Sequence, residues 1–269
     1  MFGGTVAIVT GGGSGIGHAI ALRLARLGAA VVVAGRREGP LEDTVAQIEG
    51  AGGRALAVPT DLAKIADIEA LVAGAEDRFG RVDHVINNAV MNYGGRYDEV
   101  TLDQLNHMID VSFTAPLVLS RLALPGMIAR RSGSIVMIGS TAYVGWPYVV
   151  TYSSIKAGLD GFCQALRREL AGSGIHVTAV HPGGTDTPSM TPTARREFEA
   201  LGFVILPPEV VASATVAAIR RRKPRVIIGG WEKRHVALSN LDPRLIDRTL
   251  KRMRPGFRAA MNEHQTPSP

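Results

Sequence analysis

Short apolar runs alternate along the chain with longer segments in which apolar residues recur at helical spacing. The runs lack a polar residue at every second position, which predicts strands that are buried on both faces. Strands separated by helices predict a doubly wound, mostly parallel α/β sheet in a single domain. The expected strands lie at residues 6–9, 31–33, 55–58, 84–86, 134–138, 176–180 and 225–228.

Apolar positions three or four residues apart predict the helices between these strands. The longest spans residues 101–129, and Thr101 with Gln104 forms a capping box at its start. Pro116 within it predicts a kink, because proline cannot donate to the helical ladder. The other expected helices are a first one that ends at Gly28, then residues 41–48, 65–79, 151–170 and 209–219.

Composition narrows the classes of function. Of 269 residues, 46% are hydrophobic and only 5% aromatic, which supplies a core but no base-stacking surface. The formal charge is +6, yet Lys and Arg are scattered apart from residues 220–223 and a thin C-terminal cluster. We therefore expect no nucleic-acid partner, and the positive charge suits an anionic cofactor or is incidental.

The cysteine and histidine content points to a reducing compartment and to no metal centre. Cys163 is the single cysteine, so no intrachain disulfide can form. The seven histidines show no ligand spacing, and no metal is expected. The chain enters its first strand without a signal-like segment, and no apolar run approaches the roughly 20 residues that span a bilayer. A cytoplasmic protein without an integral membrane segment is expected.

A glycine-rich turn follows the first strand. Glycines let the backbone turn sharply and approach a pyrophosphate, and the next helix directs free N–H groups at the anion. The spacing is Gly-x-x-x-Gly-x-Gly rather than Gly-x-Gly-x-x-Gly. The candidate cofactor-binding residues of this turn are Gly11, Gly13, Ser14, Gly15, Ile16 and Gly17.

The second strand ends at Arg36 and Arg37, with no acidic residue from position 34 to 37. Dinucleotide folds that prefer NAD place a carboxylate here for the ribose 2′-hydroxyl, whereas arginine pairs with a 2′-phosphate. The sequence therefore favours NADP(H).

Tyr152 and Lys156 form Tyr-x-x-x-Lys, and four residues along a helix place both side chains on one face. A phenol titrates near 10 in isolation, and a nearby ammonium favours its phenolate. We therefore predict a lowered pKa for Tyr152 and proton exchange near neutral pH.

The glycine spacing and Tyr-x-x-x-Lys, in this order, resemble the short-chain dehydrogenase/reductase family up to about residue 190. This resemblance implies a Rossmann-like fold and hydride transfer between NADP(H) and a carbonyl or alcohol. It implies that Tyr152 is the general acid or base, that Lys156 also holds the nicotinamide ribose, and that Ser140 binds the substrate oxygen. Ser140 lies twelve residues before Tyr152, where the family usually has thirteen, and Thr141 is the alternative hydroxyl.

The same resemblance extends to further cofactor contacts. Val90 stands where the family usually has glycine, which either narrows the ribose site or shifts the loop. His181 is interpreted as a packing residue at a strand end. The implied cofactor-binding residues are Asp61, Leu62, Asn88, Ala89, Tyr152, Lys156, Pro182, Gly183, Thr185 and Thr187.

Ser112 departs from the family pattern, because it occupies the position of an asparagine that supports a water linked to the lysine. A serine reaches less far, which puts the proton relay in doubt. One alternative is therefore a catalytically weakened member that acts as an NADP(H)-binding regulator or scaffold. A sugar epimerase or dehydratase is a third interpretation, although those relatives usually carry a larger C-terminal domain.

The resemblance also implies a homodimer or homotetramer and a small apolar carbonyl or alcohol substrate. The expected pocket is bounded by Ser140 and by residues 91–97, 143–148 and 184–203. We expect one domain over residues 1–264, with a substrate lid at about 184–208 and a disordered tail at 265–269. Six aromatic and apolar residues either line this pocket or are ordinary packing of the lid: Tyr143, Trp146, Tyr148, Met190, Phe198 and Phe203.

Overall fold

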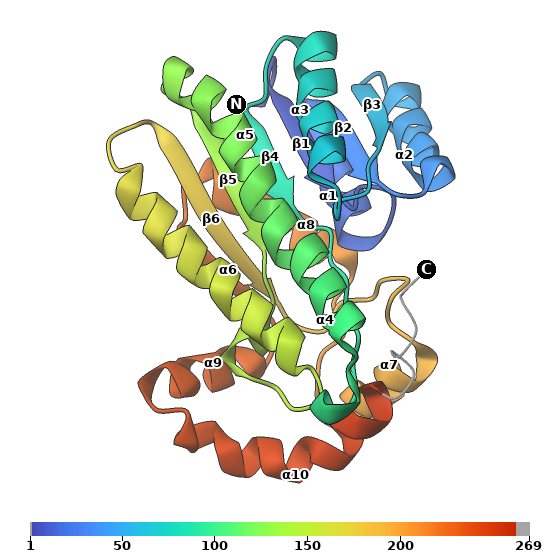
Figure 1. Cartoon of the computed structure of the whole chain (residues 1–269), viewed down its shortest axis with the longest axis vertical. Coiled ribbons are helices and arrows are strands. Elements are labelled where there is room, and N and C mark those ends of the chain that lie inside the picture. The colour runs from blue at the N-terminus through green and yellow to red at the C-terminus, as the bar shows by residue number, and fades with distance from the viewer. Residues whose placement is uncertain (1, 262–269) are drawn as a thin grey trace.

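The computed structural model describes residues 2–261. Its centre is a seven-stranded parallel sheet in the order β3-β2-β1-β4-β5-β6-β7, with helices on both faces (Figure 1). This confirms the doubly wound α/β fold. The strands are β1 (Val6–Thr10), β2 (Ala30–Gly35), β3 (Arg54–Pro59), β4 (His84–Asn87), β5 (Gly133–Ile138), β6 (Ile175–Pro182) and β7 (Arg225–Ile228).

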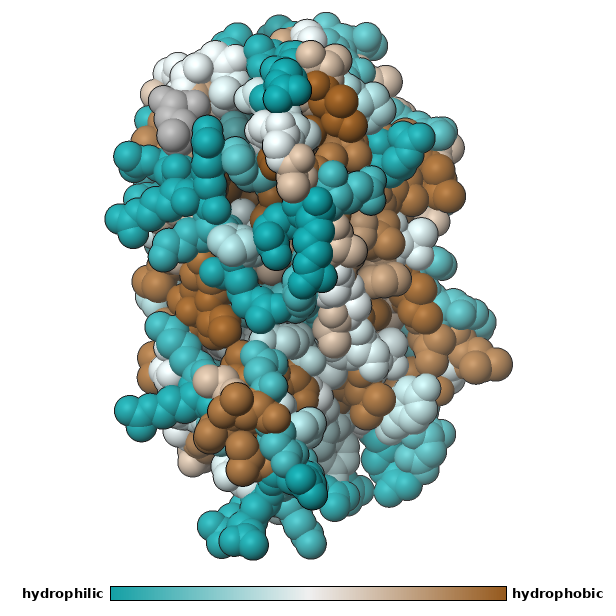
Figure 2. All heavy atoms as spheres, turned by 90° about the vertical axis from the view of Figure 1, so that its left-hand side faces the viewer, coloured by the Kyte–Doolittle hydropathy of each residue, from teal (hydrophilic) through white to brown (hydrophobic). Residues whose placement is uncertain are grey.

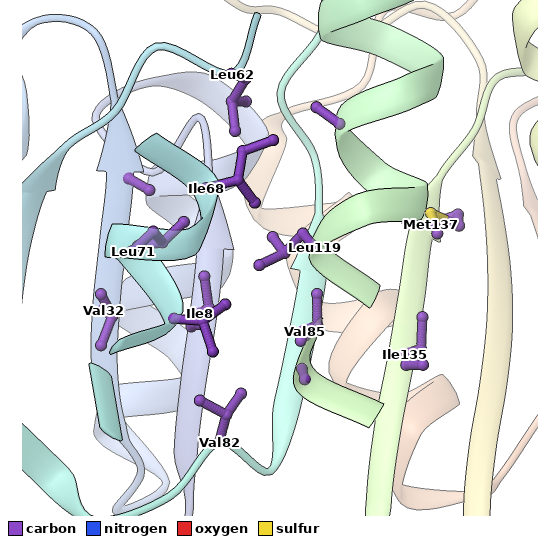
Figure 3. Packing of buried hydrophobic residues seen from close by; sticks show 14 of the residues in the cluster. Ile8, Val32, Leu62, Ile68, Leu71, Val82, Val85, Leu119, Ile135 and Met137 are labelled. Atoms are coloured by element: carbon purple, nitrogen blue, oxygen red, sulfur yellow. The ribbon is translucent and has the colours of Figure 1, made fainter. Parts of the chain in front are cut away.

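Two cores lie on the two faces of the sheet. Strand side chains such as Ile8, Val85 and Ile135 face one layer of helices, where they pack against Leu71 and Leu119 (Figure 3). This layer comprises α3 (Ile65–Phe79), α4 (Leu102–Ile109), α5 (Ala115–Arg130) and α6 (Val150–Glu169). The other face is covered by α1 (Gly15–Arg26), α2 (Glu38–Gly50) and α8 (Pro208–Arg220).

The long helix predicted over residues 101–129 is broken by a π-helical turn at Asp110–Thr114. Thr101 and Gln104 form the predicted capping box. The break falls just before Pro116, as expected of a residue without an N–H to donate. Leu102–Arg130 is long and apolar enough to cross a membrane by length and composition alone, but its inner side belongs to the core.

Three helices were missing from the sequence prediction: α7 (Pro192–Ala200), α9 (Glu232–Leu241) and α10 (Arg244–Met261). They lie beyond the carboxyl ends of the strands, at the lower end in Figure 1. In α10 the buried residues Ile246, Leu250, Met253 and Phe257 do recur at helical spacing, a signal that could have identified it. The predicted tail at 265–269 lies outside the described residues, and the domain limits stay a prediction.

Candidate active site

The turn after β1 is fastened to the end of β4 by the Thr10 hydroxyl, which accepts hydrogen bonds from the N–H groups of Asn88 and Ala89, both at 3.0 Å. The Asn88 side chain donates in return to the Thr10 carbonyl oxygen at 2.9 Å. Gly11 has a φ of +64°. A Cβ there would lie 2.9 Å from Asn88 Nδ2, so both its conformation and its packing favour glycine.

Helix α1 begins at Gly15 without a side-chain cap at Ser14 and without an acidic residue in its first turn. Its first N–H groups and the positive end of its dipole are therefore available to an anion, as the sequence predicted for a pyrophosphate. Gly17 has a packing role, since a Cβ there would lie 2.2 Å from the Gly11 carbonyl oxygen. It lets the helix approach the turn closely.

A cavity of about 410 Å³ runs along the carboxyl ends of the strands, beside this turn. It is the place where an open parallel sheet binds ligands. Of the predicted site residues, Gly17 and Ser112 are not on its wall. The wall includes Gly11, Gly13, Ser14, Gly15, Ile16, Arg36, Arg37, Asp61, Leu62, Asn88, Ala89, Ser140, Tyr152, Lys156, Pro182, Gly183, Thr185 and Thr187.

Both arginines after β2 have exposed side chains at the edge of this cavity. Within residues 2–261 neither forms an ion pair with a carboxylate, so both guanidinium groups remain available to an anion. Asp61 has its own partners: it accepts a bond from the Ala63 N–H at 3.1 Å and lies 3.6 Å from Lys64 Nζ.

Ser140, Tyr152 and Lys156 converge on the inner wall of the cavity. Ser140 follows β5, and its hydroxyl hydrogen-bonds the Tyr152 phenol despite the shortened spacing. Lys156 Nζ lies 5.4 Å from the centre of the Tyr152 ring and donates to the Ile138 carbonyl oxygen at 2.7 Å. The alternative hydroxyl, Thr141, is fully buried and has no hydrogen-bond partner among the described residues.

Burial governs the titration of this pair. It lowers the pKa of Lys156 to about 8, because the ammonium loses its hydration. Burial also raises the pKa of Tyr152, and the hydrogen bond with Ser140 only partly opposes that shift. This direction is opposite to the predicted one, because desolvation of the phenolate outweighs the hydrogen bond from Ser140. The residues of the chain alone therefore keep Tyr152 protonated, as a proton donor requires.

Ser112 lies in the π-helical turn and is buried. Its hydroxyl accepts from the Met91 N–H at 2.8 Å and donates to the Met91 carbonyl oxygen at 3.1 Å. It thereby anchors the loop after β4. The neighbouring Val90 projects outward with an exposed side chain at the cavity edge.

A buried polar cluster supports the wall behind Ser140. His181 Nε2 lies 3.0 Å from Asp160 Oδ1, and its Nδ1 lies 3.3 Å from the Ser140 carbonyl oxygen. Asp160 also pairs with Arg225 and accepts from Gln164 Nε2 at 2.7 Å. Burial pushes the pKa of Asp160 upward, but the hydrogen bond and charge of His181 and the charge of Arg225 hold it below its usual range. His181 is thus a packed residue, as predicted, with a polar partner that the sequence did not reveal.

The other end of the cavity is apolar. Trp146, Met190 and Phe198 line it as predicted, and Phe257 and Met261 of α10 complete it. The remaining aromatic candidates do not line the cavity but pack against other residues, which is the alternative that the sequence left open. Tyr143 stacks on His181 with ring centres 4.5 Å apart, Phe203 packs on Trp231 at 4.7 Å, and Tyr148 joins the adjoining hydrophobic cluster.

Comparisons with known proteins agree with this fold. Ketoacyl reductase HetN of Nostoc sp. (strain PCC 7120) is 34% identical over 91% of this chain and 88% of its own length. A metagenomic short-chain oxidoreductase solved with NADP is 30% identical, with a TM-score of 0.72 over 84% of this chain and 97% of its own.

A 3-ketoacyl-(acyl-carrier-protein) reductase from Brucella melitensis, solved with NADH, is 28% identical, with a TM-score of 0.76 over 85% of this chain and 97% of its own. Residues 5–197 match the family described as short chain dehydrogenase. The match covers strands β1 to β6, the glycine-rich turn and the Tyr-x-x-x-Lys helix, and ends before β7. The chain belongs to the short-chain dehydrogenase/reductase family of oxidoreductases.

Proposed function

We propose that the protein reduces the carbonyl group of an apolar ketone or aldehyde with NADPH, or oxidises the corresponding alcohol. One observation carries this proposal: Ser140, Tyr152 and Lys156 lie together in one cavity, between the glycine-rich turn and the apolar end of the cavity. We call this apolar end the apolar chamber; it is lined by Trp146, Met190, Phe198, Phe257 and Met261. When bound, NADPH supplies the hydride. Residues of this chain must donate the proton, position the carbonyl oxygen and stabilise the developing negative charge.

Tyr152 is the proposed proton donor, because it is held protonated by burial and reaches the cavity beside Ser140. Ser140 is proposed to hold the carbonyl oxygen within reach of the phenol. The Lys156 ammonium, fixed by its bond to Ile138, faces the same wall and is proposed to hold ribose hydroxyls and to stabilise negative charge on the phenol oxygen. Asn88, Ala89, Pro182, Gly183, Thr185 and Thr187 are proposed cofactor contacts from the strand ends.

The preference for NADPH is supported by Arg36 and Arg37 at the end of β2, whose guanidinium groups are exposed at the cavity edge. One similar structure was solved with NADP and another with NADH, so the preference depends on this local chemistry. The apolar chamber and the two ketoacyl-reductase names among the similar proteins make a 3-ketoacyl chain a reasonable first substrate.

The test follows NADPH consumption with apolar ketones, aldehydes and a 3-ketoacyl thioester, with NADH in parallel. Tyr152→Phe removes the proton donor, and we expect a rate about 10²–10⁴-fold lower with NADPH affinity retained. Tyr97→Phe is the matched control, because Tyr97 is exposed and outside the cavity wall. Turnover that survives in Tyr152→Phe would contradict the mechanism. Tight NADPH binding without turnover of any carbonyl would favour the regulator or scaffold.

We also propose that the protein forms a homodimer or homotetramer. Leu102, Ile128 and Val150 expose apolar side chains on α4, α5 and α6, which supports pairing along these helices. Light scattering on the purified chain measures this directly, and a monomer at micromolar concentration would refute it.

A further inference from the structure

The segment from Trp231 to Met261 carries most of the net positive charge of the chain. Eight Lys or Arg against three Asp or Glu give it a formal charge of +5, out of +6 for the whole chain. All eight basic side chains are exposed, whereas Glu232 is fully buried. Within residues 2–261 only Arg244 of these eight forms an ion pair, with Asp242. The outer surface of α9 and α10 is therefore strongly positive.

Leucines protrude from the same surface, where α9 turns into α10. Leu241 is 81% exposed, Leu245 52% and Leu238 41%. Helical spacing places Arg234, Leu238 and Leu241 on one face of α9. It places Leu245, Arg248 and Arg252 on one face of α10 in the same way. Each helix thus presents leucine and arginine side by side.

This surface is held in place by the opposite side of α10. Ile246, Leu250, Met253 and Phe257 are buried in a cluster with Phe203. The turn between α9 and α10 lies at the lower left in Figure 1. On the side that Figure 2 shows, hydrophobic and hydrophilic side chains mix on the surface of this lower end. The exposed leucines are therefore not a poorly folded part of the core, which is already filled behind them.

We propose that the α9–α10 surface docks the protein on an anionic lipid bilayer. Single leucines that project from a turn can enter the headgroup region of a fluid layer without a shaped partner groove. The neighbouring arginines place their charge among anionic headgroups while their hydrocarbon stems cover apolar surface. An acidic protein would complement the charge but would need pockets for three separated leucines. The charge and the leucines together favour the bilayer.

Docking here would bring the substrate chamber to the lipid. Phe257 and Met261 of α10 form part of the chamber wall, so the helix that meets the bilayer also bounds the apolar site. The binding of lipid is independent of the proposed reaction, and its test requires no turnover.

The experiment is cosedimentation of the full chain with phosphatidylcholine vesicles, with and without phosphatidylglycerol, at low and high salt. We expect binding only to the anionic vesicles, weakened by salt. Leu241→Ser with Leu245→Ser should weaken it at least about tenfold, since both side chains leave water on docking. Arg248→Gln with Arg252→Gln should weaken it as well.

Matched controls come from helix ends that lie beside the amino ends of the strands, away from α9 and α10. Leu27→Ser removes one exposed apolar side chain directly after α1. Arg220→Gln with Arg221→Gln removes two exposed charges from the end of α8. Both controls should bind like the parent chain, and thermal unfolding checks that all variants are folded. Absence of binding to anionic vesicles overturns the proposal. So does binding that the arginine changes abolish but the leucine changes leave intact, because the chain would then be adsorbed by charge alone, without insertion of the leucines.

Discussion

The two ends of the cavity are built by different means. At the cofactor end, backbone makes the wall: a glycine turn, a helix start, and strand ends fastened by Thr10. At the substrate end, side chains of α7 and α10 make it, with Phe198 and Phe257 drawn from distant segments. Backbone walls tolerate almost no added atom, whereas side-chain walls change volume with each substitution. The first end should therefore fail abruptly when altered, and the second should adjust gradually.

The sharpest failure is expected from Gly17→Val. The first added carbon would lie 2.2 Å from the Gly11 carbonyl oxygen, so the helix start must move away from the turn. We expect NADPH affinity to fall at least about 100-fold, from strain of a few kcal/mol. Gly74→Val in α3 is the control, since a Cβ at Gly74 meets no atom within 4 Å. Titration of NADPH fluorescence measures the affinity, and parental affinity in Gly17→Val would refute the close approach.

Lys156 lies between the two ends of the cavity. It should affect both turnover and the pH dependence of the free energy of unfolding. Its pKa falls from 10.5 to about 8 on burial, so between these values the unfolded chain binds more protons and the stability contribution rises with pH. Lys156→Met should remove this rise, worth roughly 3 kcal/mol, while abolishing turnover. Urea unfolding at pH 7 and at pH 9.5 should detect about 2 kcal/mol of this rise, because the contribution is flat below pH 8 and complete only at pH 10.5. Lys64→Met, which alters an exposed lysine, should keep it.

A smaller effect is expected at the cofactor edge from Arg36→Ser with Arg37→Ser. Loss of two charge-assisted contacts should lower the preference for NADPH over NADH by about 10–100-fold. The ratio of kcat/KM for the two cofactors measures it. Arg23→Ser with Arg26→Ser, on the same face of the sheet in α1, should leave the ratio unchanged. An unchanged ratio in the Arg36→Ser, Arg37→Ser variant would mean that these two arginines do not bind the 2′-phosphate.

The smallest effect is expected at the substrate end, from Phe198→Ala. Phe198 lines the chamber but is only partly buried. We expect KM for a bulky apolar ketone to change about tenfold, with NADPH affinity within twofold. Leu201→Ala, which alters the same cluster outside the chamber wall, is the control. A matching loss of NADPH affinity in Phe198→Ala would mean that the two ends are not separable.

The same contrast explains what the sequence could predict. Uninterrupted apolar runs located all seven strands, and the glycine spacing placed the turn where the structure has it. The sequence could not decide whether Tyr143 and Phe203 line the pocket or pack beside it, because their partners, His181 and Trp231, lie on other elements. The pKa of Tyr152 is raised, although the sequence predicted a lowered one, because burial of the phenol depends on the whole fold. Local pattern fixes elements and motifs, but long-range packing decides which side of a wall a side chain faces.

The position of α10 at the apolar end of the cavity has a consequence for evolution and for protein engineering. The helix adds its wall from outside the matched family region, which ends at residue 197, and it leaves the glycine turn and the Tyr152–Lys156 pair untouched. Sequence changes confined to this terminal helix could therefore alter which ligands fit the cavity while the glycine-rich turn and the Tyr152–Lys156 pair stay the same. If the proposed substrate site is correct, a chimaera that carries α10 on a relative should change substrate selectivity and leave the cofactor preference unchanged.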